Sequence, residues 1–226
     1  LDAGQRIVAA GNGALYVYQA PSTAAGAVFG KSGTGGNLTL RTPLLTGIQK
    51  SIAAYTAGGA LRVVAPDGVA PSTAASTVAG AEIDLSGDSV AIGSTILLPS
   101  GKLVVNAQHD IALQDGSRID LRGVPSMIQS ATVYGFGGDA IFTSAPGGIA
   151  QAAGGMIDVS ATHADAGTIS VSAADGAVAL AGVLNGAADD GYASGAFDVK
   201  AATLAGSSLS STLPSASTRR MPARVW

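Results

Sequence analysis

A short pattern recurs along this chain and limits the folds that are open to it. The pattern is a glycine, any residue, a large aliphatic residue, any residue, and then valine or leucine. Copies stand at residues 13–17, 36–40, 59–63, 101–105 and 167–171, and a further copy at 195–199 has phenylalanine in the aliphatic place. Apolar residues alternate with other residues in each copy, which is the pattern of a β-strand with one buried face.

The spacing of the copies indicates that the chain returns regularly to the same place. Gly13, Gly36 and Gly59 are evenly spaced, and Gly59, Gly80 and Gly101 are evenly spaced at a slightly shorter interval. No helical periodicity is present, and the 32 glycines and 9 prolines interrupt the chain too often for long helices. Short strands at intervals of about 20 residues are typical of repeat architectures.

Two all-β architectures contain many short strands, the antiparallel sandwich and the parallel β-helix. An antiparallel sandwich would carry a hairpin signal at each junction, but Asn12-Gly13 and Asn185-Gly186 do not recur along the chain. We therefore expect a right-handed parallel β-helix, a solenoid whose turns of about 20 residues stack at about 4.8 Å. The predicted β-helix covers residues 1–206, with loop-outs at 20–35, 66–79 and 124–137. We expect residues 207–226 to be a disordered tail or one foreign to the coil, because the alternation stops there.

The composition excludes several classes of protein. The chain has no cysteine and only two histidines, which argues against disulfide-linked modules, thiolate metal sites and cofactors held by such ligands. Only 12 Lys and Arg stand in 226 residues and the net charge is -3, so nucleic-acid binding is not expected. No apolar stretch approaches the roughly 20 residues of a membrane-spanning helix.

Isolated motifs predict no cofactor or metal site. Residues 30–32 are Gly-Lys-Ser, but a phosphate loop also needs a glycine five residues earlier, where Ala25 stands. Residues 134–139 are similar to glycine- and aspartate-rich calcium repeats, but they occur once and in the wrong order. His109 and His163 lack a motif that would make them ligands or bases, so we expect solvated turn residues.

Four aspartates are candidate catalytic acids. Asp84, Asp120, Asp158 and Asp198 are each flanked by apolar residues, so their carboxylates should point to water. Two carboxylates that cleave a polysaccharide lie about 5 to 9 Å apart. With turns of the expected length, successive members of this set are nearly two turns, or roughly 10 Å, from one another. The spacing therefore disfavours catalysis.

A pair of tyrosines is the candidate ligand-binding site. Tyr16 and Tyr18 alternate with Leu15 and Val17, so both rings face outward if the aliphatic side chains are buried. Exposed aromatic pairs stack on sugars or on partner proteins. The alternative is that the rings pack against a neighbouring loop.

The chain resembles large bacterial exoproteins of the filamentous-haemagglutinin type. The residues that carry the likeness are 101–107, 110–113, 117–123, 154–160, 167–173, 178–182 and 191–201. The resemblance implies a secreted or surface-exposed adhesin, exported through an outer-membrane secretion partner by the two-partner route. It further implies a non-enzymatic β-helical stalk that presents loops to a glycan or protein receptor. Asn-Pro pairs of the secretion domain are absent and residues 219–226 depart from the pattern, so we expect an internal or C-terminal fragment.

Two other functions remain open from the sequence. One is a carbohydrate-active β-helix enzyme, a polysaccharide lyase or hydrolase, which would be favoured by Asp and Arg or Lys side chains converging within about 6 Å in a groove. The other is the passenger segment of an autotransporter. For the isolated fragment, exposed strand edges at the ends of the coil predict aggregation.

Overall fold

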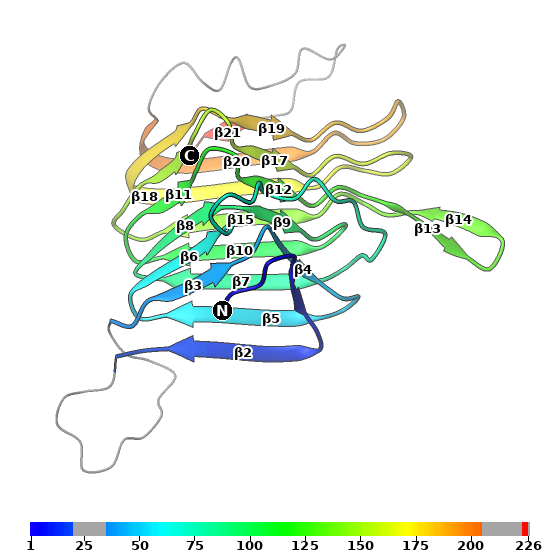
Figure 1. Cartoon of the computed structure of the whole chain (residues 1–226). Helices are drawn as coiled ribbons and strands as arrows, with labels where there is room; N and C mark the ends of the chain where they lie inside the picture. The colour runs from blue at the N-terminus through cyan, green and yellow to red at the C-terminus, as the bar shows by residue number, and fades with distance from the viewer. Residues whose placement is uncertain (20–34, 205–222, 226) are drawn as a thin grey trace.

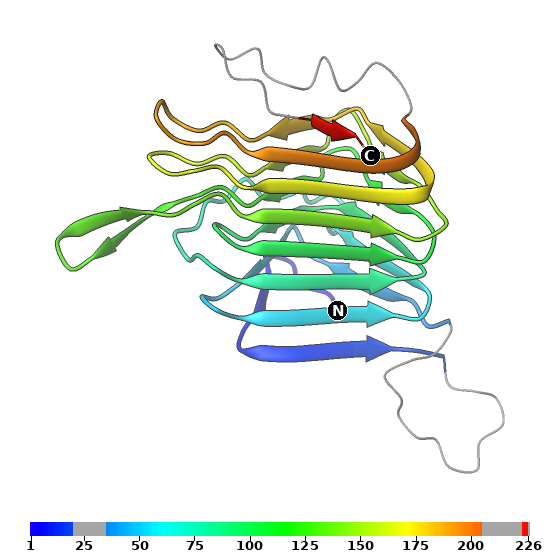
Figure 2. The ribbon, with the colours of Figure 1, turned by 180° about the vertical axis from the view of Figure 1, so that it is seen from behind.

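The computed structural model describes residues 1–19, 35–204 and 223–225, which form β-strands joined by turns and loops (Figure 1). No helix occurs in this part of the chain, and hence none that could span a membrane. The prediction of an all-β fold is confirmed. The strands stack into parallel sheets on three faces, an arrangement that is compatible with a β-helix and that we call the coil (Figure 2).

The first face holds the longest strands. Its order is β2 (Asn12–Val17), β5 (Ile52–Ala57), β7 (Glu82–Gly87), β10 (Lys102–Ala107), β15 (Asp139–Ser144), the first half of β18 (Thr168–Leu180), β20 (Ala196–Leu204) and β21 (Ala223–Val225). Each pairs in parallel with the next. Residues 223–225 lie in the predicted foreign tail, yet they add a parallel strand to β20; the rest of that tail lies outside the described residues.

The other two faces follow the first along the chain. The second face is built from β3 (Leu38–Arg41), β6 (Ala60–Val64), β8 (Ser89–Gly93), β11 (Ile111–Leu113), β16 (Ile149–Gln151) and the second half of β18. The third face is built from β1 (Ile7–Ala9), β4 (Leu44–Gly47), β9 (Thr95–Leu97), β12 (Arg118–Asp120), β17 (Met156–Asp158) and β19 (Val183–Asn185). A complete turn runs from β10 through β11 and β12 and returns at β15, which pairs with β10.

The length of a turn varies along the coil, and the expected length of about 20 residues does not hold for every turn. Glu82 and Lys102 are register partners 20 residues apart, whereas Asn12 and Ile52 are partners 40 residues apart. The glycine pattern marks single strands rather than whole turns, since Gly13 lies on the first face and Gly36 precedes a strand of the second. Insertions between strands therefore change the turn length without changing the pairing.

Aliphatic and aromatic side chains form continuous ladders inside the coil. One ladder on the first face contains the register partners Leu15, Tyr55, Leu85, Val105, Phe142, Val171 and Val199. All of these are buried except Leu15, which is 37% exposed because β2 ends the sheet. The alternation seen in the sequence thus places one residue in two on the core side.

A glycine ladder explains why glycine begins so many of these strands. Gly101, Gly138 and Gly167 occupy equivalent positions just before β10, β15 and β18. A Cβ atom on Gly138 would overlap the carbonyl oxygen of Gly101, and one on Gly167 would overlap that of Gly138. The same carbonyl groups accept hydrogen bonds from Asp139 and Thr168 of the next turn. Glycine is required here for close approach of stacked backbones.

The predicted loop-outs differ in structure. Residues 20–34 lie outside the described residues. Residues 66–79 form no strand, as expected, and the strand-free segment extends over 65–81. This second loop lies against the third face, where Thr95 Oγ1 donates to the carbonyl of Ser72 at 2.6 Å. The segment 124–137 is not a simple loop, because it contains an antiparallel hairpin of β13 (Pro125–Ile128) and β14 (Ala131–Tyr134) that extends away from the coil (Figure 1).

One polar side chain interrupts the core of the second face. Gln151 is buried between its register partners Leu113 and Leu180, and its Oε1 has no hydrogen-bond partner. A buried acceptor without a partner costs about 1 to 3 kcal/mol.

Truncation within one ladder tests the stacking of the turns. Leu85→Ala should lower the free energy of unfolding by about 3 kcal/mol, because it removes a fully buried side chain between two turns. Leu15→Ala is the matched control at the open end of the same ladder and should cost about 1 kcal/mol or less. Urea denaturation measures both, and equal losses would contradict the stacked ladder.

Gln151→Leu should raise the free energy of unfolding by about 1 kcal/mol, because leucine matches the neighbouring turns and leaves no unpaired carbonyl. Gln114→Leu, at an exposed position nearby, is the control and should give no such gain. Thermal and urea denaturation compare the two variants. A loss of stability in Gln151→Leu would show that the amide is satisfied in solution.

Candidate functional site

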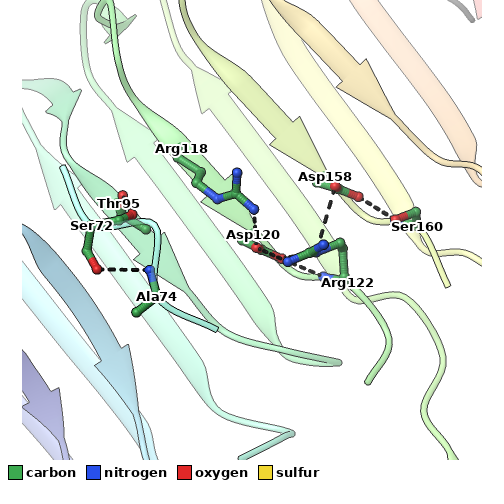
Figure 3. A network of polar contacts seen from close by, with 8 residues as sticks. All are labelled: Ser72, Ala74, Thr95, Arg118, Asp120, Arg122, Asp158 and Ser160. Carbon is green, nitrogen blue, oxygen red and sulfur yellow. Dashed lines mark hydrogen bonds and ion pairs between the residues drawn. The ribbon is translucent and has the colours of Figure 1, made fainter. Parts of the chain in front are cut away.

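A cluster of charged side chains lies on the outer side of the third face (Figure 3). Arg118, Asp120 and Arg122 alternate with Ile119 and Leu121, which point into the core. Residues two apart on a strand share one side, so the three charged side chains meet outside the sheet. Asp158 joins them because β17 pairs with β12.

The expected separation of these carboxylates is wrong. Asp120 and Asp158 are direct register partners on neighbouring strands, not residues nearly two turns apart. The reason is the hairpin insertion, which lengthens this turn so that the chain from Asp120 to Asp158 completes a single circuit. Asp84 and Asp198 lie elsewhere, on the first face, where the register partners Val104, Ile141 and Ser170 stand between them.

Both carboxylate oxygens of Asp120 accept hydrogen bonds from arginine side chains. Its Oδ2 accepts hydrogen bonds from Nη2 of Arg118 at 2.7 Å and from Nη2 of Arg122 at 2.8 Å. Its Oδ1 accepts from Nε of Arg122 at 2.9 Å, so the Arg122 contact is bidentate. Arg122 Nε also lies 3.8 Å from Oδ2 of Asp158, and Arg122 thus lies between two carboxylates of successive turns.

Burial of the two carboxylates contradicts the expectation that they point to water. The side chain of Asp120 is 1% exposed and that of Asp158 is 7% exposed. Arg118 on β12 and Arg122 just after it flank Asp120. Asp158 Oδ1 accepts hydrogen bonds from the backbone N and from Oγ of Ser160 at 3.0 and 2.6 Å. The carboxylates face outward from the sheet, but neighbouring groups cover them.

The electrostatics of Asp120 fit an ion pair that stabilises the fold. Burial alone would raise the pKa of Asp120, but the hydrogen bonds and charges of Arg122 and Arg118 outweigh it and bring the pKa below the ordinary 3.8. The Asp120 hydrogen bond raises the pKa of Arg122, against the effect of burial. A carboxylate held ionised in this way does not serve as a general acid at neutral pH.

Asp84 shows the opposite behaviour. Its carboxylate is half-buried on β7, and burial, followed by the charge of Glu82, raises its pKa although Lys102 acts in the other direction. Lys102 Nζ instead contacts Glu82 Oε1 at 2.8 Å, and Asp84 Oδ1 has no hydrogen-bond partner. Asp198 is likewise half-buried, on β20. Neither aspartate faces solvent as fully as expected.

The tyrosine pair lies at the N-terminal edge of the first face. The rings of Tyr16 and Tyr18 stack with centroids 6.3 Å apart and planes inclined by 17°. Tyr16 on β2 is exposed and Tyr18 is half-buried. Leu15 is exposed rather than buried, because no further turn covers β2 in the described structure. The stacked pair presents an aromatic surface whose function remains a prediction.

Both histidines are exposed, as expected, but each has an acidic neighbour that the sequence did not suggest. His109 Nδ1 lies 2.9 Å from Oδ1 of Asp88, and His163 Nδ1 lies 3.0 Å from Oδ2 of Asp189. The members of each pair come from successive turns of the coil. These pairs could be found from the sequence only with the correct length of each turn.

No metal centre is formed by the described part of the chain. In residues 1–19, 35–204 and 223–225, no three His, Cys, Asp or Glu side chains gather closely enough to hold a metal ion. The segment similar to calcium repeats instead spans the end of β14 and the beginning of β15. The Gly-Lys-Ser segment at 30–32 lies outside the described residues.

Comparison of the chain with protein-family models, with curated proteins and with solved structures found no match. The function therefore has to be inferred from the coil, the cluster around Asp120 and the exposed side chains.

Replacing Asp120 tests whether the cluster stabilises the fold. Asp120→Asn should lower the free energy of unfolding by about 2 kcal/mol at pH 7, because two arginines lose their charged acceptor. Asp175→Asn makes the same change of charge at an exposed position and should have little effect.

The same pair of variants gives a pH test. A folded-state pKa below 3.8 means that the Asp120 stabilisation is present above pH 3.8 and is lost as pH falls toward the folded-state value. The difference in the free energy of unfolding between the unsubstituted chain and Asp120→Asn should therefore become smaller in acid. Urea denaturation from neutral to acidic pH measures it, and a constant difference would exclude the ion pair as its source.

Proposed function

We propose that this chain is a segment of a large secreted or surface-exposed bacterial adhesin, similar to the filamentous-haemagglutinin type. In this proposal the segment is a non-enzymatic stalk, a right-handed parallel β-helix whose parent protein is exported through an outer-membrane partner. The stalk spans distance from the cell and presents side chains and loops to a glycan or protein receptor.

The observation that carries this proposal is the uninterrupted ladder from Leu15 to Val199. Each turn buries its apolar side chains against the turns before and after it, so adding turns adds length without a new core. The outer side of the first face mixes small polar residues, such as Thr56, Ser86 and Thr143, with charged and apolar ones. A fold that extends by repetition suits a stalk.

A carbohydrate-active enzyme is the second candidate, and the adjacency of Asp120 and Asp158 favours it. Neighbouring carboxylates with an arginine between them are the convergence that such an enzyme needs. Against this, Asp120 is covered and both of its oxygens already accept hydrogen bonds from arginines. A substrate would have to displace those contacts, so we assign the cluster a role in stabilising the fold.

Adhesion tests the first candidate. The chain immobilised on beads should retain cells or glycans from an array, and Tyr16→Ala and Tyr18→Ala should each weaken retention about tenfold, because a stacked ring is lost. Tyr192→Ala removes a comparably exposed ring from a loop elsewhere and is the matched control. Absence of retention, or equal retention by all variants, would reject the tyrosine pair as the receptor contact.

Sugar release tests the second candidate. The chain incubated with a panel of acidic and neutral polysaccharides should release no unsaturated or reducing ends above a blank. Release that disappears in Asp158→Asn, with the fold retained by circular dichroism, would replace the stalk by the enzyme.

A further inference from the structure

The β13–β14 hairpin, residues 125–134, is an arm that pairs with no other described strand. Its strands pair only with each other, through partners such as Met127 and Thr132. Figures 1 and 2 show the arm extending well beyond the wall of the coil. The outer edges of both strands are therefore accessible to another chain.

The arm has the composition of an interface rather than of a solvated loop. Residues 123–138 include no Asp, Glu, Lys or Arg. Met127 and Phe136 are 70% and 65% exposed, and Val133 and Tyr134 are exposed as well. Natural proteins protect open strand edges with charges, prolines or covering loops, because an unprotected edge pairs with other strands.

Only one of the two edges is protected. Pro125 stands in β13 and removes a backbone N–H from that edge. β14 has no proline, its four residues are all exposed, and Thr132, Val133 and Tyr134 favour extended strands. The edge of β14 is therefore the better site for adding a strand.

The base of the arm is held in place by the coil. Gly135 N donates to the carbonyl of Val124 at 3.1 Å, closing the two strands at the base. The Tyr134 ring meets the His163 ring edge-on, with centroids 4.9 Å apart and planes at 86°. A fixed base reduces the entropy that the arm loses when it binds a partner.

We propose that β14 pairs antiparallel with β14 of a second copy of this chain, forming a four-stranded sheet that joins two coils side by side. A strand that pairs with itself across a two-fold axis makes a closed dimer. Two uncharged arms meet without repulsion, whereas a charged partner would find no complementary charge on residues 123–138. A two-stranded hairpin alone is only marginally stable in water, and two further strands remedy this.

This proposal goes beyond the stalk function and does not rest on it. Dimerisation through the arm is limited to two copies, whereas association through the open ends of the coil continues to larger species. An oligomer measurement therefore tests the arm, and the adhesion measurement tests the stalk.

Sedimentation velocity of the 226-residue chain over a wide range of concentrations provides the first test. The unsubstituted 226-residue chain should show a reversible monomer–dimer equilibrium. Val133→Lys should raise the dimer Kd at least about tenfold, because it places two ammonium groups across the two-fold axis. Val78→Lys is the matched control, since Val78 and Val133 are 42% and 45% exposed and Val78 lies in the loop against the third face.

Cross-linking is the second test, and the absence of cysteine from the chain makes it specific. Val133→Cys, at the two-fold axis, should form a disulfide-linked dimer with oxidised glutathione, whereas Thr132→Cys, offset by two residues from its copy, and Val78→Cys should not. Circular dichroism checks that each variant keeps its strands. A monomer at every concentration, a dimer unaffected by Val133→Lys, or equal cross-linking of all three cysteine variants would overturn the proposal.

Discussion

The structure depends on backbone hydrogen bonds between successive turns. These bonds hold the strands in a register that stacks apolar side chains in ladders inside the coil. Each turn uses the backbone groups of the turn before it, as Asp139 and Thr168 do with the carbonyls of Gly101 and Gly138. Successive turns lie so close together that the corner before β10, β15 and β18 requires glycine. The pleat of each strand turns one side chain in two toward the core. The ladders, the glycine pattern and the scarcity of charge all follow from this stacking.

The same stacking explains where polar and charged side chains are excluded and where they lie close together. The interior is filled by ladders, so polar groups inside it are exceptions such as Gln151. Charged groups collect on the outside, and stacking brings residues of successive turns together, as in Arg122 between Asp120 and Asp158. Insertions leave the coil at its corners, and the hairpin arm is the insertion whose edge and composition suggest a partner.

The strands and the buried residues could be predicted because alternation is a local property. Leu103, Val105 and Ile169 are buried as the pattern predicts. Which strands lie side by side in the sheets could not be predicted, because this depends on the lengths of the insertions between strands, which no local pattern encodes. The cluster at Asp120 was missed for this reason, since the interval from Asp120 to Asp158 is one turn only when the arm is known to interrupt it. The available signal was the alternation of the charged residues Arg118, Asp120 and Arg122 with the apolar residues Ile119 and Leu121.

Distances along one outward ladder test the stacking most directly. Thr56, Ser86, Asn106, Thr143, Ser172 and Lys200 are successive register partners on the first face. Spin labels on cysteines introduced at position 56 and at 143, 172 or 200 should give distances that rise by about 4.8 Å per turn, to roughly 14, 19 and 24 Å between backbones. Distances that do not increase in this order would contradict the parallel coil.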